Sequence, residues 1–140
     1  MITVEHAKSL LVGELTPLPG ETLMKTINAL GNTLAQDLYA PVDLPPFNQS
    51  NVDGYAVHLS DNFTWNIVAE IKAGDSTQLK LTEGEAARIY TGAMVPDGSD
   101  LIIMQEKVNR KGAFLHYSDT HELKQGEHIR LKGIQIKKGI

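Results

Sequence analysis

The sequence changes character at Leu44-Pro-Pro-Phe-Asn-Gln-Ser-Asn-Val-Asp-Gly-Tyr-Ala-Val57. Pro45 and Pro46 lack a backbone N–H and have a restricted φ, so neither can continue a helix or join a central strand. We expect an ordered extended loop over residues 42–50. The strands expected after it are Gly54 to His58, Thr64 to Ile71, Glu85 to Tyr90, Leu101 to Val108, Ala113 to Tyr117 and His128 to Leu131. Short strands separated by glycine turns predict a β-rich domain, barrel-like or made of coiled sheets, with Asn109 to Gly112 as a tight hairpin.

The residues before this loop favour helix. Thr3 is a suitable N-cap, and apolar residues recur at helical spacing after it, so we expect an amphipathic helix over residues 3–14. The pattern over residues 21–40 predicts a short helix ending near Gly31 and a second short element through Leu38. The expected fold class is therefore mainly β with a short N-terminal helical segment.

The composition excludes several classes of protein. The chain has 140 residues, 41% of them hydrophobic and 21% charged, as in one or two small ordered domains. A net charge of -4 and a pI near 5.7 argue against a nucleic-acid binder. The chain has no cysteine, and no apolar run reaches the length of a membrane span. No secretory signal is visible at the N-terminus, so we expect a cytoplasmic protein with neither nucleic acid nor membrane as partner.

Two positions stand out as candidate functional residues. Asp53 and Thr91 each directly precede a glycine and lie beside an apolar, strand-like run. This arrangement presents a carboxylate or a hydroxyl at the rim of a rigid sheet, where backbone can approach a ligand closely. A carboxylate held between a proline-rich loop and a strand suits a magnesium or phosphate-bound metal. From the residues alone, two side chains that cap ordinary turns remain the plainer interpretation.

Other candidates are weaker. The stretch His116 to Glu122 contains two imidazoles and two carboxylates, but a polar turn between strands explains it better than a metal site. Glu106 is placed to pair with Arg88 or Lys107. No glycine-rich phosphate loop precedes a helix, which excludes the common nucleotide-binding motifs.

Motifs along nearly the whole chain resemble the MoeA/gephyrin family, the enzymes that insert molybdenum into molybdopterin. The resemblance is carried, in chain order, by Ala29-Leu-Gly31, Leu34-Ala35, Asp37, Ala40-Pro41, Asp43, Pro45-Pro-Phe47, Ser50, Asp53-Gly-Tyr-Ala56, Ala73-Gly74, Gly84-Glu-Ala86, Arg88-Ile89, Thr91-Gly-Ala93, Pro96, Gly98, Asp100, Gly126, Ile129-Arg130, Gly133 and Ile136.

The resemblance implies a domain organisation. Residues 1–41 would form a helical segment that is part of an elongated domain, and residues 42–124 would form a β-rich domain carrying the signature loop. Residues 125–140 would return to the elongated domain. Members of the family are longer, so the chain is expected to stop before an α/β domain that binds molybdopterin. Family members are elongated homodimers, with the active cleft formed between the two subunits.

The resemblance also implies a chemistry. The full enzyme would insert molybdate into adenylated molybdopterin with release of AMP, in a step that depends on Mg²⁺. Asp53 and Thr91 would be the catalytic residues, with Asp53 as the magnesium ligand and Thr91 hydrogen-bonded to the ligand. Ser50, Gly54 and Gly92 would contribute to binding the pterin. The 140-residue chain alone is expected to be inactive.

The sequence departs from the family pattern at four places. Asn32, Asn48-Gln49, Asn51-Val52 and Ile134-Gln135 replace the residues usual in the family, and the last replaces an acidic pair. The loss of that pair favours an alternative, a dimerisation or scaffold module without chemistry of its own. A generic β-domain that binds a small ligand is a third alternative.

Overall fold

The computed structural model describes residues 2–16, 19–76, 78–119 and 122–140. The chain divides into two compact units, Met1–Leu38 and Tyr39–Ile140, and each unit is described by itself. The expected assignment of residues 125–140 to an elongated domain stays a prediction.

The first unit contains helix α1 (Val4–Glu14) and a 3₁₀ turn, η1 (Thr26–Asn28). The Oγ1 atom of Thr3 accepts a hydrogen bond from the backbone N–H of His6 at 3.2 Å, which confirms the expected cap and helix. Among the residues described in this unit, no side chain is buried. In the part of the chain that the structure describes, no helix is long and apolar enough to cross a membrane.

The short α-helix expected to end near Gly31 and the second short element expected through Leu38 do not form. Only η1 forms between residues 21 and 38. Ile27 and Leu30, which would have formed the apolar face of such a helix, are 86% and 96% exposed. A short helix without a packed face does not repay the cost of its first turn, and a single 3₁₀ turn results.

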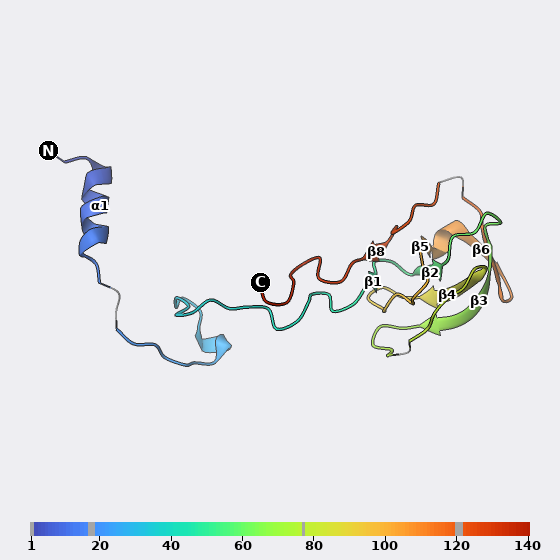
Figure 1. Ribbon diagram of the computed structural model, residues 1–140, viewed down its shortest axis with the longest axis horizontal. Coiled ribbons are helices and arrows are strands. Elements are labelled where there is room, and N and C mark those ends of the chain that lie inside the picture. Colours follow the sequence, from blue (N-terminus) through green and yellow to red (C-terminus); the bar gives the residue numbers. More distant parts are fainter. Residues whose placement is uncertain (1, 17–18, 77, 120–121) are drawn as a thin grey trace. The chain divides into compact units, whose positions relative to one another are not determined.

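The second unit is built on a curled, six-stranded sheet (Figure 1). Its strands are β2 (Gly54–Val57), β3 (Thr64–Ile71), β4 (Glu85–Ile89), β5 (Leu101–Met104), β6 (Val108–Lys111) and β7 (Phe114–Tyr117). Their order is β5-β2-β4-β3-β7-β6. Strands β3 and β4 run parallel, and every other neighbouring pair is antiparallel. The mainly β, coiled-sheet fold class is confirmed.

Apolar side chains pack on both faces of the sheet. Tyr55 and Val57 of β2 belong to one cluster with Trp65, Leu101 and Ile103, among others. Ala56, which points to the opposite face, belongs to a second cluster. All four residues of β2 are buried, as expected for a strand with a neighbour on each side and a core on each face.

The expected single strand over residues 101–108 is wrong. Strand β5 ends at Met104, and a 3₁₀ turn, η2 (Gln105–Lys107), separates it from β6. The interruption has a topological reason, because β5 and β6 lie at opposite edges of the sheet and the chain must turn between them. The hairpin expected at Asn109 to Gly112 is confirmed, since β6 pairs antiparallel with β7 across Gly112, which has a φ of 62°.

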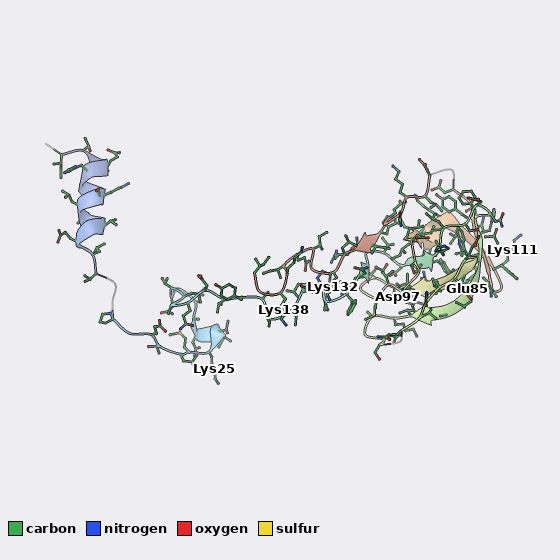
Figure 2. All side chains as sticks on the ribbon, viewed as in Figure 1. Lys25, Glu85, Asp97, Lys111, Lys132 and Lys138 are labelled. Atoms are coloured by element: carbon green, nitrogen blue, oxygen red, sulfur yellow. The ribbon has the colours of Figure 1, made fainter. Side chains whose placement is uncertain are left out.

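The sheet unit begins and ends in two segments that lie side by side (Figure 1). Residues 40–45 exchange backbone hydrogen bonds with residues 133–140, and the two-residue strands β1 (Gln49–Ser50) and β8 (Ile129–Arg130) continue the pairing. Asp43 accepts a hydrogen bond from the backbone N–H of Lys138 at 2.9 Å and pairs with Lys132 at 3.4 Å. We call these paired segments, residues 40–50 and 129–140, the clasp. Lys132 and Lys138, which belong to it, are labelled in Figure 2. The loop over residues 42–50 is extended as expected, except that it ends in β1.

Candidate functional site

The sheet brings Asp53 and Thr91 into contact. Asp53 directly precedes β2, and Thr91 follows β4 by two residues. These strands are antiparallel with Gly54 opposite Ile89, so the start of one lies beside the end of the other. The Oδ1 atom of Asp53 accepts hydrogen bonds from both the backbone N–H and the hydroxyl of Thr91, each at 2.8 Å. Both side chains are exposed to solvent.

The remaining predicted site residues surround this pair. The backbone N–H of Gly92 donates to the carbonyl of Ser50 at 2.9 Å, which ties the loop before β2 to the turn after β4. Ser50 is buried, and its hydroxyl is hydrogen-bonded to the backbone of Val52, so the side chain shapes the loop rather than facing solvent. Gly54 lies so close to β5 that a Cβ atom there would stand 2.1 Å from the carbonyl oxygen of Ile103.

Asp53 is held in its charged form. The backbone N–H of Thr91 lowers the pKa of the Asp53 carboxyl most, and the Thr91 hydroxyl and the positive charge of Arg88 lower it further, against a partial desolvation that raises it. Both donors from Thr91 meet Oδ1, so Oδ2 remains available to a cation or a hydrogen-bond donor. The hydroxyl hydrogen of Thr91 is given to Asp53, which leaves its oxygen to act toward a ligand as an acceptor.

Arg88 also belongs to this site, although the sequence pattern indicated only an ion-pair partner. Its Nη1 atom donates to the carbonyl of Gly54 at 2.8 Å, and Nη2 donates to Oε1 of Gln105 at 2.5 Å. Its guanidinium carbon lies 5.1 Å from the ring centre of Tyr55 and 4.6 Å from that of Tyr90. Glu106, which the sequence placed to pair with Arg88 or Lys107, accepts a hydrogen bond from Nε2 of Gln105 at 3.1 Å instead. The available signal was an arginine between the apolar residues Ala87 and Ile89 of a predicted strand, two residues before a tyrosine.

The described residues form no cluster of several metal ligands. They contain no group of three or more His, Cys, Asp or Glu residues that could hold a metal ion. A lone exposed carboxylate nevertheless suits Mg²⁺, which keeps several waters and commonly takes one or two protein carboxylates together with substrate phosphates. In the stretch from His116 to Glu122, Thr120 and His121 lie outside the described residues, and Asp119 pairs with Lys107 at 3.3 Å.

A cleft of about 680 Å³ lies elsewhere in the sheet unit. It is lined by the loop between β2 and β3, including Leu59 and Phe63, and by residues at and after the end of β7, including Tyr117. Asp53 precedes β2 and Leu59 follows it, so the cleft and the Asp53–Thr91 pair lie at opposite ends of this strand. We therefore assign the candidate site by the chemistry of its residues rather than by the size of the cleft.

Comparison with known proteins identifies relatives of the whole chain. The family described as the MoeA N-terminal region, domains I and II, matches residues 2–140. A molybdopterin molybdenumtransferase of Haemophilus influenzae is 36% identical, over 99% of this chain and 35% of its own length. A molybdopterin molybdenumtransferase of a Nostoc species is 37% identical, over 79% of this chain and 27% of its own length. The chain thus spans about a third of these relatives.

A solved structure shares the fold. The crystal structure of a molybdopterin biosynthesis MoeA protein from Pyrococcus horikoshii OT3 superposes with a TM-score of 0.85. The superposition covers 97% of this chain and 38% of that one, with 29% sequence identity.

Proposed function

Because the chain belongs to the MoeA N-terminal region family, we propose that it is the N-terminal part of an enzyme of molybdenum cofactor biosynthesis. The complete enzyme would insert molybdate into adenylated molybdopterin and release AMP. The relatives are named molybdopterin molybdenumtransferases, which supports a role in molybdenum cofactor biosynthesis. Because the chain covers only about a third of their length, the activity of the complete enzyme is part of the proposal. The observation that carries the site assignment is the ionised Asp53 carboxylate, oriented by two hydrogen bonds from Thr91.

The roles of the site residues follow from their geometry. Asp53 would hold Mg²⁺ through Oδ2, because Oδ1 is occupied by Thr91. When bound, the cation would neutralise the charge that develops on phosphate oxygens as the bond to AMP breaks. Thr91 would keep the carboxylate ionised and correctly turned, and its hydroxyl oxygen could accept a hydrogen bond from the substrate. Gly54 and Gly92 would let the backbone approach the pterin, with Ser50 supporting the loop beneath.

The proposal includes partners. The chain would supply one edge of the active cleft, and the pterin would be held mainly by a later domain. It would act as a homodimer in the cytoplasm. The exposed apolar side chains of the first unit, such as Leu11, Ile27 and Leu30, support burial against another part of the enzyme or a second subunit. Alone, the chain would neither bind molybdopterin tightly nor insert metal.

The test is a single substitution in the complete protein. Asp53→Asn preserves the shape and the acceptor of the Thr91 hydrogen bonds but removes the charge. We expect molybdate-dependent AMP release to fall by about 100-fold, a typical effect of losing one preorganised electrostatic group. Asp61→Asn, in an exposed turn at the other end of β2, is the matched control and should retain normal turnover. Normal turnover by the Asp53 variant would refute the assignment.

A scaffold module without chemistry is the second candidate. It is favoured by Ile134-Gln135, which replaces an acidic pair of the family, and by the exposed apolar side chains of the first unit. This function predicts that the complete protein self-associates normally but releases no AMP, whether Asp53 is present or replaced. Light scattering and the AMP assay on the same samples separate the two candidates.

A further inference from the structure

We propose that Arg88 is a positioning residue that couples the two halves of the Asp53–Thr91 site. One half is the turn that leads into β2, and the other is the turn that follows β4. The catalytic consequence rests on the proposed function, whereas the coupling itself is a property of this chain.

The strand register places the partners of Arg88 on one face of the sheet. Arg88 lies opposite Tyr55 on β2 and opposite Glu70 on β3. Asp53 and Tyr55 are two residues apart, and Arg88 and Tyr90 are two residues apart, so alternation directs each pair to the same side. This face also carries the apolar cluster that contains Tyr55 and Ala86.

The hydrogen bonds of Arg88 converge on the first half of the site. Nη1 donates to the carbonyl of Gly54, the residue next to Asp53. Nη2 donates to Gln105, whose own backbone N–H donates to the carbonyl of Asp53 at 3.2 Å. The backbone on both sides of the Asp53–Gly54 peptide is thus linked to Arg88, either directly or through Gln105.

The ring contacts of Arg88 reach both halves. Tyr55 directly follows Gly54, and Tyr90 directly precedes Thr91. The guanidinium group lies near both rings, at 5.1 and 4.6 Å. The hydroxyl of Tyr90 in turn donates to Glu70 at 3.2 Å, and Glu70 pairs with Lys72 at 3.5 Å. The Tyr90 side chain is therefore held by Arg88 at its ring and by Glu70 at its hydroxyl, and this fixes the position from which the chain continues to Thr91.

Arginine suits this position better than lysine. Its planar guanidinium can stack on aromatic rings while two of its nitrogen atoms donate in a defined plane. A lysine at the same position would keep the positive charge near Asp53 but would lose the stacking and the forked geometry. Arg88→Lys therefore separates positioning from charge.

Hydrogen exchange measured on this chain tests the coupling directly. We expect Arg88→Lys and Arg88→Gln to accelerate exchange of the Thr91 amide about tenfold, as its bond to Asp53 opens more often. Exchange of amides in the middle of β2 should not change. Arg110→Lys is the matched control, since Arg110 donates only to Gly112 within the β6–β7 hairpin among the described contacts. Unchanged Thr91 exchange in both Arg88 variants, or equal acceleration throughout the sheet, would overturn the proposal.

Steady-state kinetics of the complete protein test the consequence. Arg88→Lys should lower kcat by about tenfold while KM changes by less than about twofold, as for other residues that orient a functional group. If Asp53→Asn leaves activity intact, the proposed function fails and the exchange result still decides the coupling. If Asp53→Asn abolishes activity but Arg88→Lys changes neither kcat nor Thr91 exchange, the proposed function stands and the role of Arg88 is refuted.

Discussion

Gly54 illustrates how a single residue makes the candidate site possible. It is buried between β4 and β5, and its lack of a side chain allows the Asp53 turn to approach the backbone of Ile103. The site and the close packing of the sheet therefore depend on the same position. A side chain there would displace either the strand or the carboxylate next to it.

We expect Gly54→Ala to destabilise the sheet unit by about 1–3 kcal/mol, the usual cost of forcing a methyl group into a packed interior. Urea unfolding followed by the fluorescence of Trp65, which is buried, measures the change. Gly13→Ala in α1 is the control, because nothing lies within 4 Å of the added methyl group. A Gly54 variant as stable as the wild type would contradict the packing described for β5.

At the scale of elements, the clasp is held partly by charge. Asp43 accepts from the backbone N–H of Lys138 and pairs with Lys132. The hydrogen bond from Lys138 lowers the pKa of the Asp43 carboxyl most, and Lys132 and Lys137 also lower it, against a partial desolvation. A lowered pKa means that this carboxylate stabilises the clasp above the ordinary aspartate value and loses the effect as the pH falls through its folded pKa.

The clasp should therefore loosen in acid. We expect the amide resonance of Lys138 to shift as the pH falls below about 3.9, the ordinary aspartate pKa, because the hydrogen bond weakens when Asp43 is protonated. Asp43→Asn should remove this titration, since the amide oxygen accepts a hydrogen bond but does not ionise. A Lys138 resonance that titrates identically in the variant would show that another group is responsible.

The sequence predicted elements whose signals are local. Thr3 with its apolar period predicted α1, and short strand-like runs separated by glycine turns predicted β3 and the β6–β7 hairpin. The strand expected from His128 to Leu131 contains β8, but β1 was not predicted, because it has two residues and forms only through β8, far along the chain. The strand expected through Val108 failed for a related reason, since the turn at η2 is required by the strand order rather than by the local residues.

The candidate site was predictable to a similar degree. The glycines after Asp53 and Thr91 indicated two exposed turns, and the family resemblance associated them with one chemistry. Nothing in the spacing indicated that the hydroxyl of Thr91 donates to Asp53. Arg88 was overlooked because its partners, Gly54, Gln105 and the two tyrosines, come together only once β5, β2 and β4 are aligned.

At the scale of the whole molecule, the two units contribute unequally to stability. Among its described residues the first unit buries no side chain, whereas the second contains both apolar clusters. We expect deletion of residues 1–38 to change the free energy of unfolding of the sheet by less than about 0.5 kcal/mol, as for surface changes generally. Urea unfolding monitored by Trp65 fluorescence provides the measurement.

Deletion of residues 133–140 is the comparison at the other end. It removes the hydrogen bonds that these residues exchange with residues 40–45, so it should lower the unfolding midpoint measurably. A large loss of stability after deleting residues 1–38 instead would mean that the helical unit supports the sheet.

The clasp also determines how the sheet unit responds to mechanical load. The chain enters and leaves this unit at adjacent points, with Ala40 bonded to Ile140 and Gly139, and Leu44 bonded to Ile136 further along. Tension applied between residues 40 and 140 would act on these hydrogen bonds one at a time, beginning with those nearest the two ends. The six strands would be loaded only after β1 and β8 had separated. A pull transmitted through the ends of this unit would thus be absorbed by the paired segments before it could distort the turns that hold Asp53 and Thr91.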